Sequence, residues 1–211
     1  MHGIKRDAYF IVSLNRVDVL TLAGLLTACA GLAHAYRGSI SLAIGLMLIA
    51  MFMDMIDGML ARRLGLESEF GRFLDSFCDV FIYLVLPLFI LYQMGIQGPL
   101  SLAILFGFLT GGLLRLAQFN IIGTVEEKGV AYHTGLQVIW SHLVVVLAFP
   151  GLFLLGNRAH PALLIILSVM SLLMISNWRF PKPIWYKTQT LIILAVTAVY
   201  LYLHLIGIHT P

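Results

Sequence analysis

Seven apolar segments, each close to the length of a membrane span, constrain the fold of this chain more than any other feature of its sequence. They are Val17–Tyr36, Ser39–Arg63, Phe70–Gly95, Pro99–Ile121, Tyr132–Leu155, Pro161–Ile175 and Trp185–Ile206. A transmembrane helix needs about 20 mostly apolar residues. Only 11% of the residues are charged, against about 25% in a soluble domain. We therefore expect an all-α, polytopic transmembrane helical bundle of six to seven spans, in one domain covering residues 1–211.

The basic residues predict how the spans are oriented. If the N-terminus is cytosolic, ten Lys and Arg residues fall on the cytosolic side and only Arg37 and Arg158 on the other. This asymmetry is the positive-inside pattern of a multi-pass integral membrane protein. The basic residues form no stripe, so no nucleic-acid partner is expected. Residues 1–16 are predicted to form a short amphipathic N-terminal surface helix on the membrane lipids.

Four aspartates interrupt this apolar chain in the stretch DMIDGMLARRLGLESEFGRFLDSFCD, residues 54–79. The first part places Asp54, Asp57, Gly58 and Ala61 at i, i+3, i+4 and i+7, which is one face of a helix. Asp75 and Asp79 are four residues apart on the next helix. We predict that the turn between the two helices is bounded by a helix-ending glycine and an N-capping serine. These are Gly65 and Ser68.

The two acidic faces can therefore meet in an antiparallel hairpin, just below the cytosolic surface of the membrane. Converging carboxylates suit hard divalent cations, Mg²⁺ or Mn²⁺, and two such ions can hold a pyrophosphate and its leaving group. A proton relay or a cation pathway through the membrane is the alternative use of carboxylates at this depth. Either way, the cluster predicts a functional site on the cytosolic side.

The full spacing D-x2-D-G-x2-A-R-x8-G-x3-D-x3-D is similar to the signature of the CDP-alcohol phosphatidyltransferase family, and every fixed position is matched. The resemblance implies a helical membrane core, a CDP-linked lipid donor, two divalent ions and a homodimer. By position, one ion would bind Asp54, Asp57 and Asp75. Asp57, Asp75 and Asp79 would share the second, and Asp79 would also take the proton from the acceptor hydroxyl. Six residues would line the CDP-donor pocket: Gly58, Ala61, Arg62, Gly71, Asp18 and Thr21.

Two further stretches resemble the phosphatidylserine synthase branch of that family. Leu114–Asn120 is similar to the LRLARFN stretch of the branch, with Gln118 in place of its second arginine, and Ser176–Lys182 is similar to its late basic stretch. The segment from Tyr132 to Gln137 departs from the pattern F-x-G-L-P that the branch usually has there. The expected acceptor-binding residues are Arg115, Gln118, His133 and Lys182.

The predicted activity is transfer of a phosphatidyl group from CDP-diacylglycerol to a small alcohol with release of CMP. L-serine is the expected acceptor. Glycerol 3-phosphate and an inositol phosphate are the alternatives within the family, although a phosphorylated acceptor should need several converging basic residues. A cation- or proton-coupled transporter is the alternative from another class, and a non-catalytic relative that binds the lipid donor is a third. His133 and His142 are nine residues apart, so we predict that they fall on opposite faces of one helix and do not share a metal.

Overall fold

The computed structural model describes residues 12–123, 125–127, 130–181 and 186–211. The chain is predominantly helical. Its elements in order are α1 (Arg16–Tyr36), α2 (Ile40–Leu64), α3 (Glu69–Asp79), η1 (Val80–Val85), α4 (Leu86–Gln93), α5 (Pro99–Ile122), β1 (Val125–Glu127), β2 (Val130–Thr134), α6 (Trp140–Leu155), η2 (Gly156–Ala159), α7 (His160–Met174), β3 (Arg179–Pro181) and α8 (Tyr186–Leu205). The predicted all-α bundle is therefore confirmed, and most of residues 1–16 lies outside the described part.

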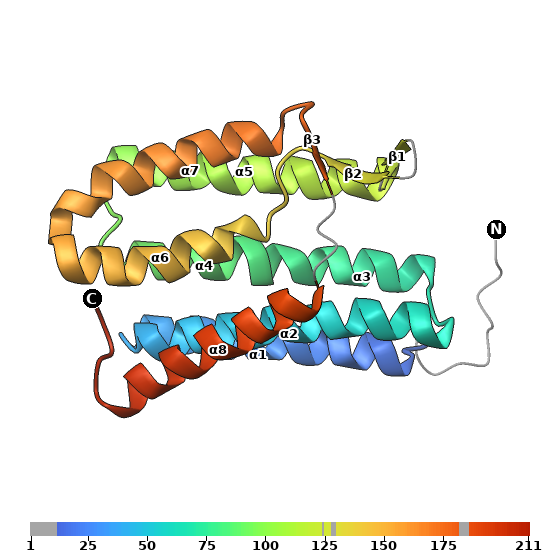
Figure 1. Cartoon of the computed structure of the whole chain (residues 1–211), viewed down its shortest axis with the longest axis horizontal. Helices are drawn as coiled ribbons and strands as arrows, with labels where there is room; N and C mark the ends of the chain where they lie inside the picture. Colours follow the sequence, from blue (N-terminus) through green and yellow to red (C-terminus); the bar gives the residue numbers. More distant parts are fainter. Residues whose placement is uncertain (1–11, 124, 128–129, 182–185) are drawn as a thin grey trace.

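Six helical stretches are long and apolar enough to cross a membrane. The protein is therefore an integral, multi-pass membrane protein. The third stretch, Glu69–Gln93, runs through α3, η1 and α4 without a break. The fifth, Trp140–Met174, contains two shorter helices, α6 and α7, which Figure 1 shows doubling back on each other. The fifth and sixth predicted segments correspond to these two helices.

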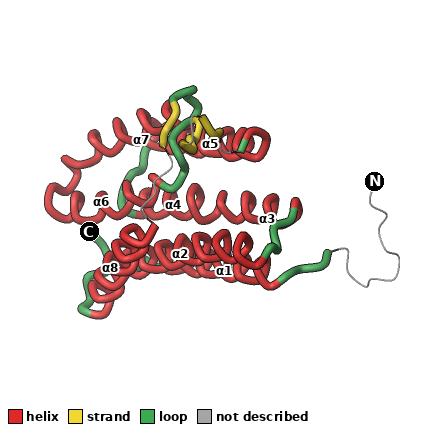
Figure 2. Tube along the Cα trace, turned by 45° about the vertical axis from the view of Figure 1, so that its right-hand side comes forward, coloured by secondary structure: helices red, strands yellow, loops and turns green. Residues whose placement is uncertain are grey.

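The helices run roughly parallel to one long axis (Figure 1). α2 packs against α1 and α8, and α5 packs against α7. The continuous α3–η1–α4 stretch and α6 lie between these two groups in both views (Figures 1 and 2). Apolar side chains that are mostly exposed, such as Leu26, Phe106 and Leu205, face outward, as lipid-facing residues of a membrane bundle do.

The hairpin that carries the acidic motif is built as the sequence predicts. Gly65 ends α2 with φ of 63°, a left-handed conformation that glycine adopts without steric cost. Ser68 caps α3, because its hydroxyl accepts a hydrogen bond from the Gly71 amide at 2.9 Å. At the start of α1, Asn15 and Asp18 form a reciprocal capping box. These caps fix the ends of α1, α2 and α3 that meet at the motif hairpin.

A π-helical turn, η1, interrupts the third stretch directly after Asp79. Pro87 in the first turn of α4 has no N–H to donate to the carbonyl of Tyr83, four residues earlier, and its ring would press against that carbonyl. The hydroxyl of Ser141 in α6 donates to the Tyr83 carbonyl instead, at 2.6 Å. Single π turns inside helices are frequent at functional sites.

The sequence-based prediction for the fifth span is wrong at its start. Residues 130–134 form β2, the middle strand of a three-stranded antiparallel sheet, and α6 begins only at Trp140. β2 pairs with β1 and with β3, so that His133 lies opposite Phe180. His133 and His142 therefore belong to a strand and a helix, not to opposite faces of one helix. The sheet joins the chain after α5 to the chain after α7.

Candidate active site

Three of the four motif aspartates converge between α2 and α3. Asp54, Asp57 and Asp75 each present a carboxylate oxygen, and these oxygens lie within 4.8 Å of one another. Asp57 is 2% exposed. The predicted meeting of the two acidic helix faces is thus observed, and carboxylates at this spacing could hold a metal ion.

Asp79 belongs to the same cluster. Its carboxylate interacts electrostatically with those of Asp54, Asp75 and Asp57. One oxygen of Asp79, Oδ1, and one of Asp57, Oδ2, are buried without a hydrogen-bond partner among the described residues. Buried charged oxygens are stable only when paired, protonated or bound to a metal. The two unpartnered oxygens therefore fit a hard divalent cation, which takes oxygen ligands.

Two arginines supply positive charge to opposite sides of the cluster. Arg62 acts electrostatically on Asp57 and Asp75 from the exposed end of α2. Arg115 in α5 is 7% exposed and acts on Asp79. Arg115 forms no ion pair with a described residue, so its interaction with Asp79 is electrostatic and acts at longer range. Two arginines do not balance the charge of four carboxylates, so the cluster can still take up a cation.

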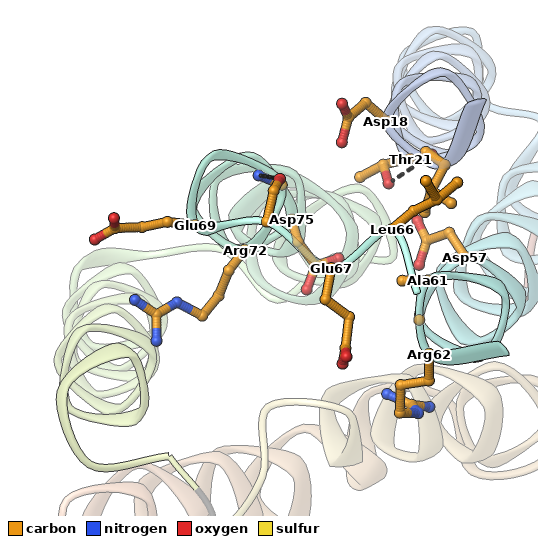
Figure 3. Close-up of a pocket in the computed structure, with 14 residues that line it drawn as sticks. Asp18, Thr21, Asp57, Ala61, Arg62, Leu66, Glu67, Glu69, Arg72 and Asp75 are labelled. Atoms are coloured by element: carbon orange, nitrogen blue, oxygen red, sulfur yellow. Dashed lines mark hydrogen bonds between the residues drawn. The ribbon is translucent and has the colours of Figure 1, made fainter. Parts of the chain in front are cut away.

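A cavity of about 490 Å³ opens beside the cluster, between α1, α2 and α3. Its walls include Asp57, Asp75 and all six residues predicted for the CDP-donor pocket: Asp18, Thr21, Gly58, Ala61, Arg62 and Gly71. Thr21 and Asp57 point toward the space between the three helices, whereas Glu69 points away from it (Figure 3). A volume of this size lies within the range of small-molecule sites in proteins.

The two motif glycines serve different local needs. A Cβ on Gly71 would lie 3.0 Å from the Ser68 hydroxyl and 3.1 Å from Oδ1 of Asp18, closer than side chains normally approach. Gly71 thus lets the start of α3 approach α1. A Cβ on Gly58 would lie 3.6 Å from the nearest atom, a guanidinium nitrogen of Arg62, which is an ordinary contact. The absence of a side chain at Gly58 therefore widens the cavity and is not required by packing.

Tyr83 is a site residue that sequence reasoning missed. Its hydroxyl donates a hydrogen bond to Oδ2 of Asp54 at 2.7 Å. The available signal was its spacing, because Tyr83 follows Asp75 and Asp79 by eight and four residues and so continues their helix face. The motif spacing ends at Asp79 and gave no reason to extend the face by another turn.

Two of the four expected acceptor-binding residues, Arg115 and His133, contact the same aromatic ring, that of Phe119. The Arg115 guanidinium lies over the ring of Phe119, 4.9 Å from its centroid, and the His133 ring lies 5.8 Å from the same ring. Both Arg115 and His133 are 7% exposed. Phe119, which the prediction did not include, therefore connects the end of α5 to β2.

Gln118 and Lys182 are the other two expected acceptor residues. Gln118 is exposed on α5, one turn beyond Arg115, and Lys182 lies outside the described residues.

A contact that the sequence did not predict joins α5 to α3. Asn120 and Ser76 exchange two hydrogen bonds, of 2.8 and 3.1 Å, so the end of α5 is tied to the helix of Asp75 and Asp79.

Comparison with known proteins agrees with this geometry. Among curated proteins, the chain is 32% identical over 134 residues to the CDP-diacylglycerol–serine O-phosphatidyltransferase of Bacillus subtilis, covering 62% of this chain and 70% of that protein. It is 29% identical over 191 residues to the enzyme of the same name from Methanocaldococcus jannaschii, covering 90% and 83%. It is 26% identical to the phosphatidylcholine synthase of Agrobacterium fabrum, covering 96% and 92%.

The CDP-alcohol phosphatidyltransferase family matches residues 14–169, a region that runs from the start of α1 into α7. This region includes the four aspartates, the cavity, Arg115 and His133. Because the match covers well over half of the chain, the protein is an enzyme of the CDP-alcohol phosphatidyltransferase family.

Proposed function

We propose that the enzyme transfers a phosphatidyl group from CDP-diacylglycerol to L-serine and releases CMP. The serine hydroxyl oxygen forms a bond to the phosphorus that carries the diacylglycerol. The bond from that phosphorus to the bridging oxygen of CMP breaks, and the hydroxyl proton passes to Asp79. The products are phosphatidylserine and CMP.

The observation that carries this proposal is the position of Asp79 between two different environments. On one side it joins Asp54, Asp57 and Asp75, beside the cavity. On the other side it faces the charge of Arg115. A carboxylate between the cluster beside the cavity and the buried Arg115 could take a proton from an attacking hydroxyl group.

The donor side of the proposal uses the cavity between α1, α2 and α3. The cytidine and its phosphates would occupy this space, with Arg62 at the exposed end neutralising phosphate oxygens. The small residues Gly58, Ala61 and Gly71 leave the room that a flat base needs. Asp18 and Thr21 line the same cavity from α1.

We further propose that the cluster holds two Mg²⁺ or Mn²⁺ ions. Asp54, Asp57 and Asp75 would hold the first, and Asp57, Asp75 and Asp79 the second. When bound, the ions supply electrostatic stabilisation to the pyrophosphate and to the departing CMP phosphate. The close oxygens of Asp54, Asp57 and Asp75 and the two unpartnered oxygens support this assignment.

The charge of the acceptor side favours serine over other alcohols. Arg115 is the one arginine or lysine that is buried in the described part of the chain. One guanidinium can bind the carboxylate of serine, whereas a phosphorylated acceptor should need several basic groups. Arg115 would repel the quaternary ammonium group of choline. Two relatives named CDP-diacylglycerol–serine O-phosphatidyltransferase, at 29% and 32% identity, also support this acceptor.

An acceptor panel tests the proposal. Purified enzyme in mixed micelles with CDP-diacylglycerol and Mn²⁺ should release CMP with L-serine, and not with glycerol 3-phosphate, an inositol phosphate or choline. Chelation by EDTA should stop the release, and added Mn²⁺ should restore it. CMP release with another alcohol alone would overturn the serine assignment. The absence of release with every alcohol would favour a cation- or proton-coupled transporter or a donor-binding relative without activity.

The proposed enzyme is a homodimer whose N-terminus and active site face the cytosol. Arg16 begins α1 and Leu205 ends α8 at opposite ends of the bundle (Figure 1). An alkaline phosphatase fused after Pro211 should therefore be active outside the cytoplasm, and a green fluorescent protein fused there should stay dark. Crosslinking of purified protein in lipid should give a two-chain product.

A further inference from the structure

Tyr83 contacts the acidic cluster without lining the cavity beside it. Its side chain is 4% exposed, and its hydroxyl donates to Asp54 Oδ2 at 2.7 Å. A hydrogen bond to a charged acceptor is stronger than one between neutral groups. Asp54 therefore has one carboxylate oxygen held by a neutral donor, within a group of carboxylates that repel one another.

The backbone and ring of Tyr83 are themselves held from two directions. Its carbonyl, which Pro87 leaves without the usual helical donor, accepts from the Ser141 hydroxyl at 2.6 Å. Its ring packs on the ring of His142, with 4.8 Å between centroids. Both contacts come from the first turn of α6, so the phenol is fixed by a different helix from the ones that carry the aspartates.

We propose that Tyr83 is a positioning residue that sets metal affinity by holding the Asp54 carboxylate in its ligating orientation. This inference rests on the metal site of the proposed function. Groups that hydrogen-bond to metal ligands fix the orientation of the ligand, and their loss typically weakens metal binding by 10–100-fold. Without the phenol, the Asp54 side chain can rotate away from Asp57 and Asp75, because like charges favour separation.

The test compares two tyrosines that are buried to the same extent. Tyr83→Phe removes one hydroxyl and keeps the ring. Tyr200→Phe is the matched control, because Tyr200 is also 4% exposed and its hydroxyl also donates at 2.7 Å, to the Val146 carbonyl in α6. Binding of Mn²⁺ to each purified protein is measured directly, from the EPR signal of free Mn²⁺, without lipid donor or turnover.

Tyr83→Phe should raise the Mn²⁺ dissociation constant by about tenfold or more, and Tyr200→Phe should leave it unchanged. The Mn²⁺ concentration for half-maximal CMP release should rise by the same factor, while kcat at saturating Mn²⁺ stays within about threefold of the wild-type value. An unchanged dissociation constant in Tyr83→Phe, with or without a lower melting temperature, would show a merely structural role. Absence of Mn²⁺ binding by the wild type would instead refute the metal site itself.

A second variant decides the question if Tyr83→Phe does not fold. Ser141→Ala keeps the phenol but removes the donor to the Tyr83 carbonyl, so it should weaken Mn²⁺ binding in the same direction by about threefold. A Ser141→Ala protein that folds and binds Mn²⁺ like the wild type would overturn the proposal.

Discussion

Alanine at Gly71 and alanine at Gly58 should have opposite effects on stability, although both glycines belong to the motif and line the cavity. At Gly71 the new methyl group would lie 3.0 Å from the Ser68 hydroxyl and 3.1 Å from Asp18. The methyl group must displace one or both of these caps. Loss of an N-cap lowers the free energy of unfolding by about 0.5–2 kcal/mol. The loss at the α3 cap, together with a smaller loss at the α1 cap, should come to roughly 1–2 kcal/mol.

At Gly58 the methyl group meets no atom closer than 3.6 Å. Gly58 is inside α2, where alanine is favoured over glycine by about 0.5–1 kcal/mol. For a chain of this size, each kcal/mol shifts Tm by roughly 2–4 °C. Gly71→Ala should therefore lower Tm by about 2–8 °C, and Gly58→Ala should raise it by about 1–4 °C.

Heat unfolding of both variants in detergent, without donor, measures these shifts, and KM for CDP-diacylglycerol is measured in parallel. The methyl group at Gly58 narrows the cavity, so that variant should show a higher donor KM together with a higher Tm. The reasoning is refuted if Gly71→Ala is as stable as Gly58→Ala. That result would mean that α3 does not approach α1 through Gly71.

Three further substitutions test other parts of the site. Asp79→Asn should keep the fold and lower kcat by about 10²–10⁴-fold, the usual contribution of a general base; a wild-type rate would remove Asp79 from that role. Arg115→Ala should raise KM for the acceptor more than KM for CDP-diacylglycerol, and the reverse pattern would move Arg115 to the donor side. Gln118→Arg should leave the acceptor profile unchanged, because residue 118 is exposed; a new preference in the acceptor panel would return that residue to the site.

The acidic hairpin could be predicted because its information is local. Asp54, Asp57 and Gly58 share a helix face by spacing alone, and Gly65 and Ser68 are residues that end and begin helices for reasons of backbone conformation and hydrogen bonding. Long apolar segments likewise identify membrane helices without reference to their neighbours. The fold class and the meeting of the acidic faces therefore followed from the sequence.

The three-stranded sheet could not be predicted in the same way, because its partners are distant in sequence. Tyr132, His133 and Thr134 continue an apolar run, and their pairing with residues 179–181 depends on where α7 ends. Gly135 has φ of 75°, and a side chain there would collide with the carbonyl of Met174. Its amide donates to the Trp178 carbonyl at 2.8 Å. Nothing local to Gly135 indicates that contact.

Tyr83 was missed for a related reason. Its phenol is useful only because Asp54, 29 residues earlier, lies opposite it. Pro87 leaves the Tyr83 carbonyl without its usual helical donor, and the serine that donates to this carbonyl is 58 residues later. Spacing could have shown that Tyr83 continues the aspartate face. Its role, however, depends on contacts with Asp54 and with α6 that only the tertiary packing brings about.

The three-stranded sheet contributes to the surroundings of Arg115, so that different parts of the chain form this region and the cavity. The cavity is lined by α1, α2, α3 and the turn between α2 and α3, whereas Phe119 at the end of α5 links Arg115 to His133 in β2. Under the proposed function, substitutions in β2 and β3 can change which alcohol is accepted, while the residues that bind CDP stay the same. A serine enzyme and a choline enzyme can then share the same donor site and differ mainly in the residues of this small sheet.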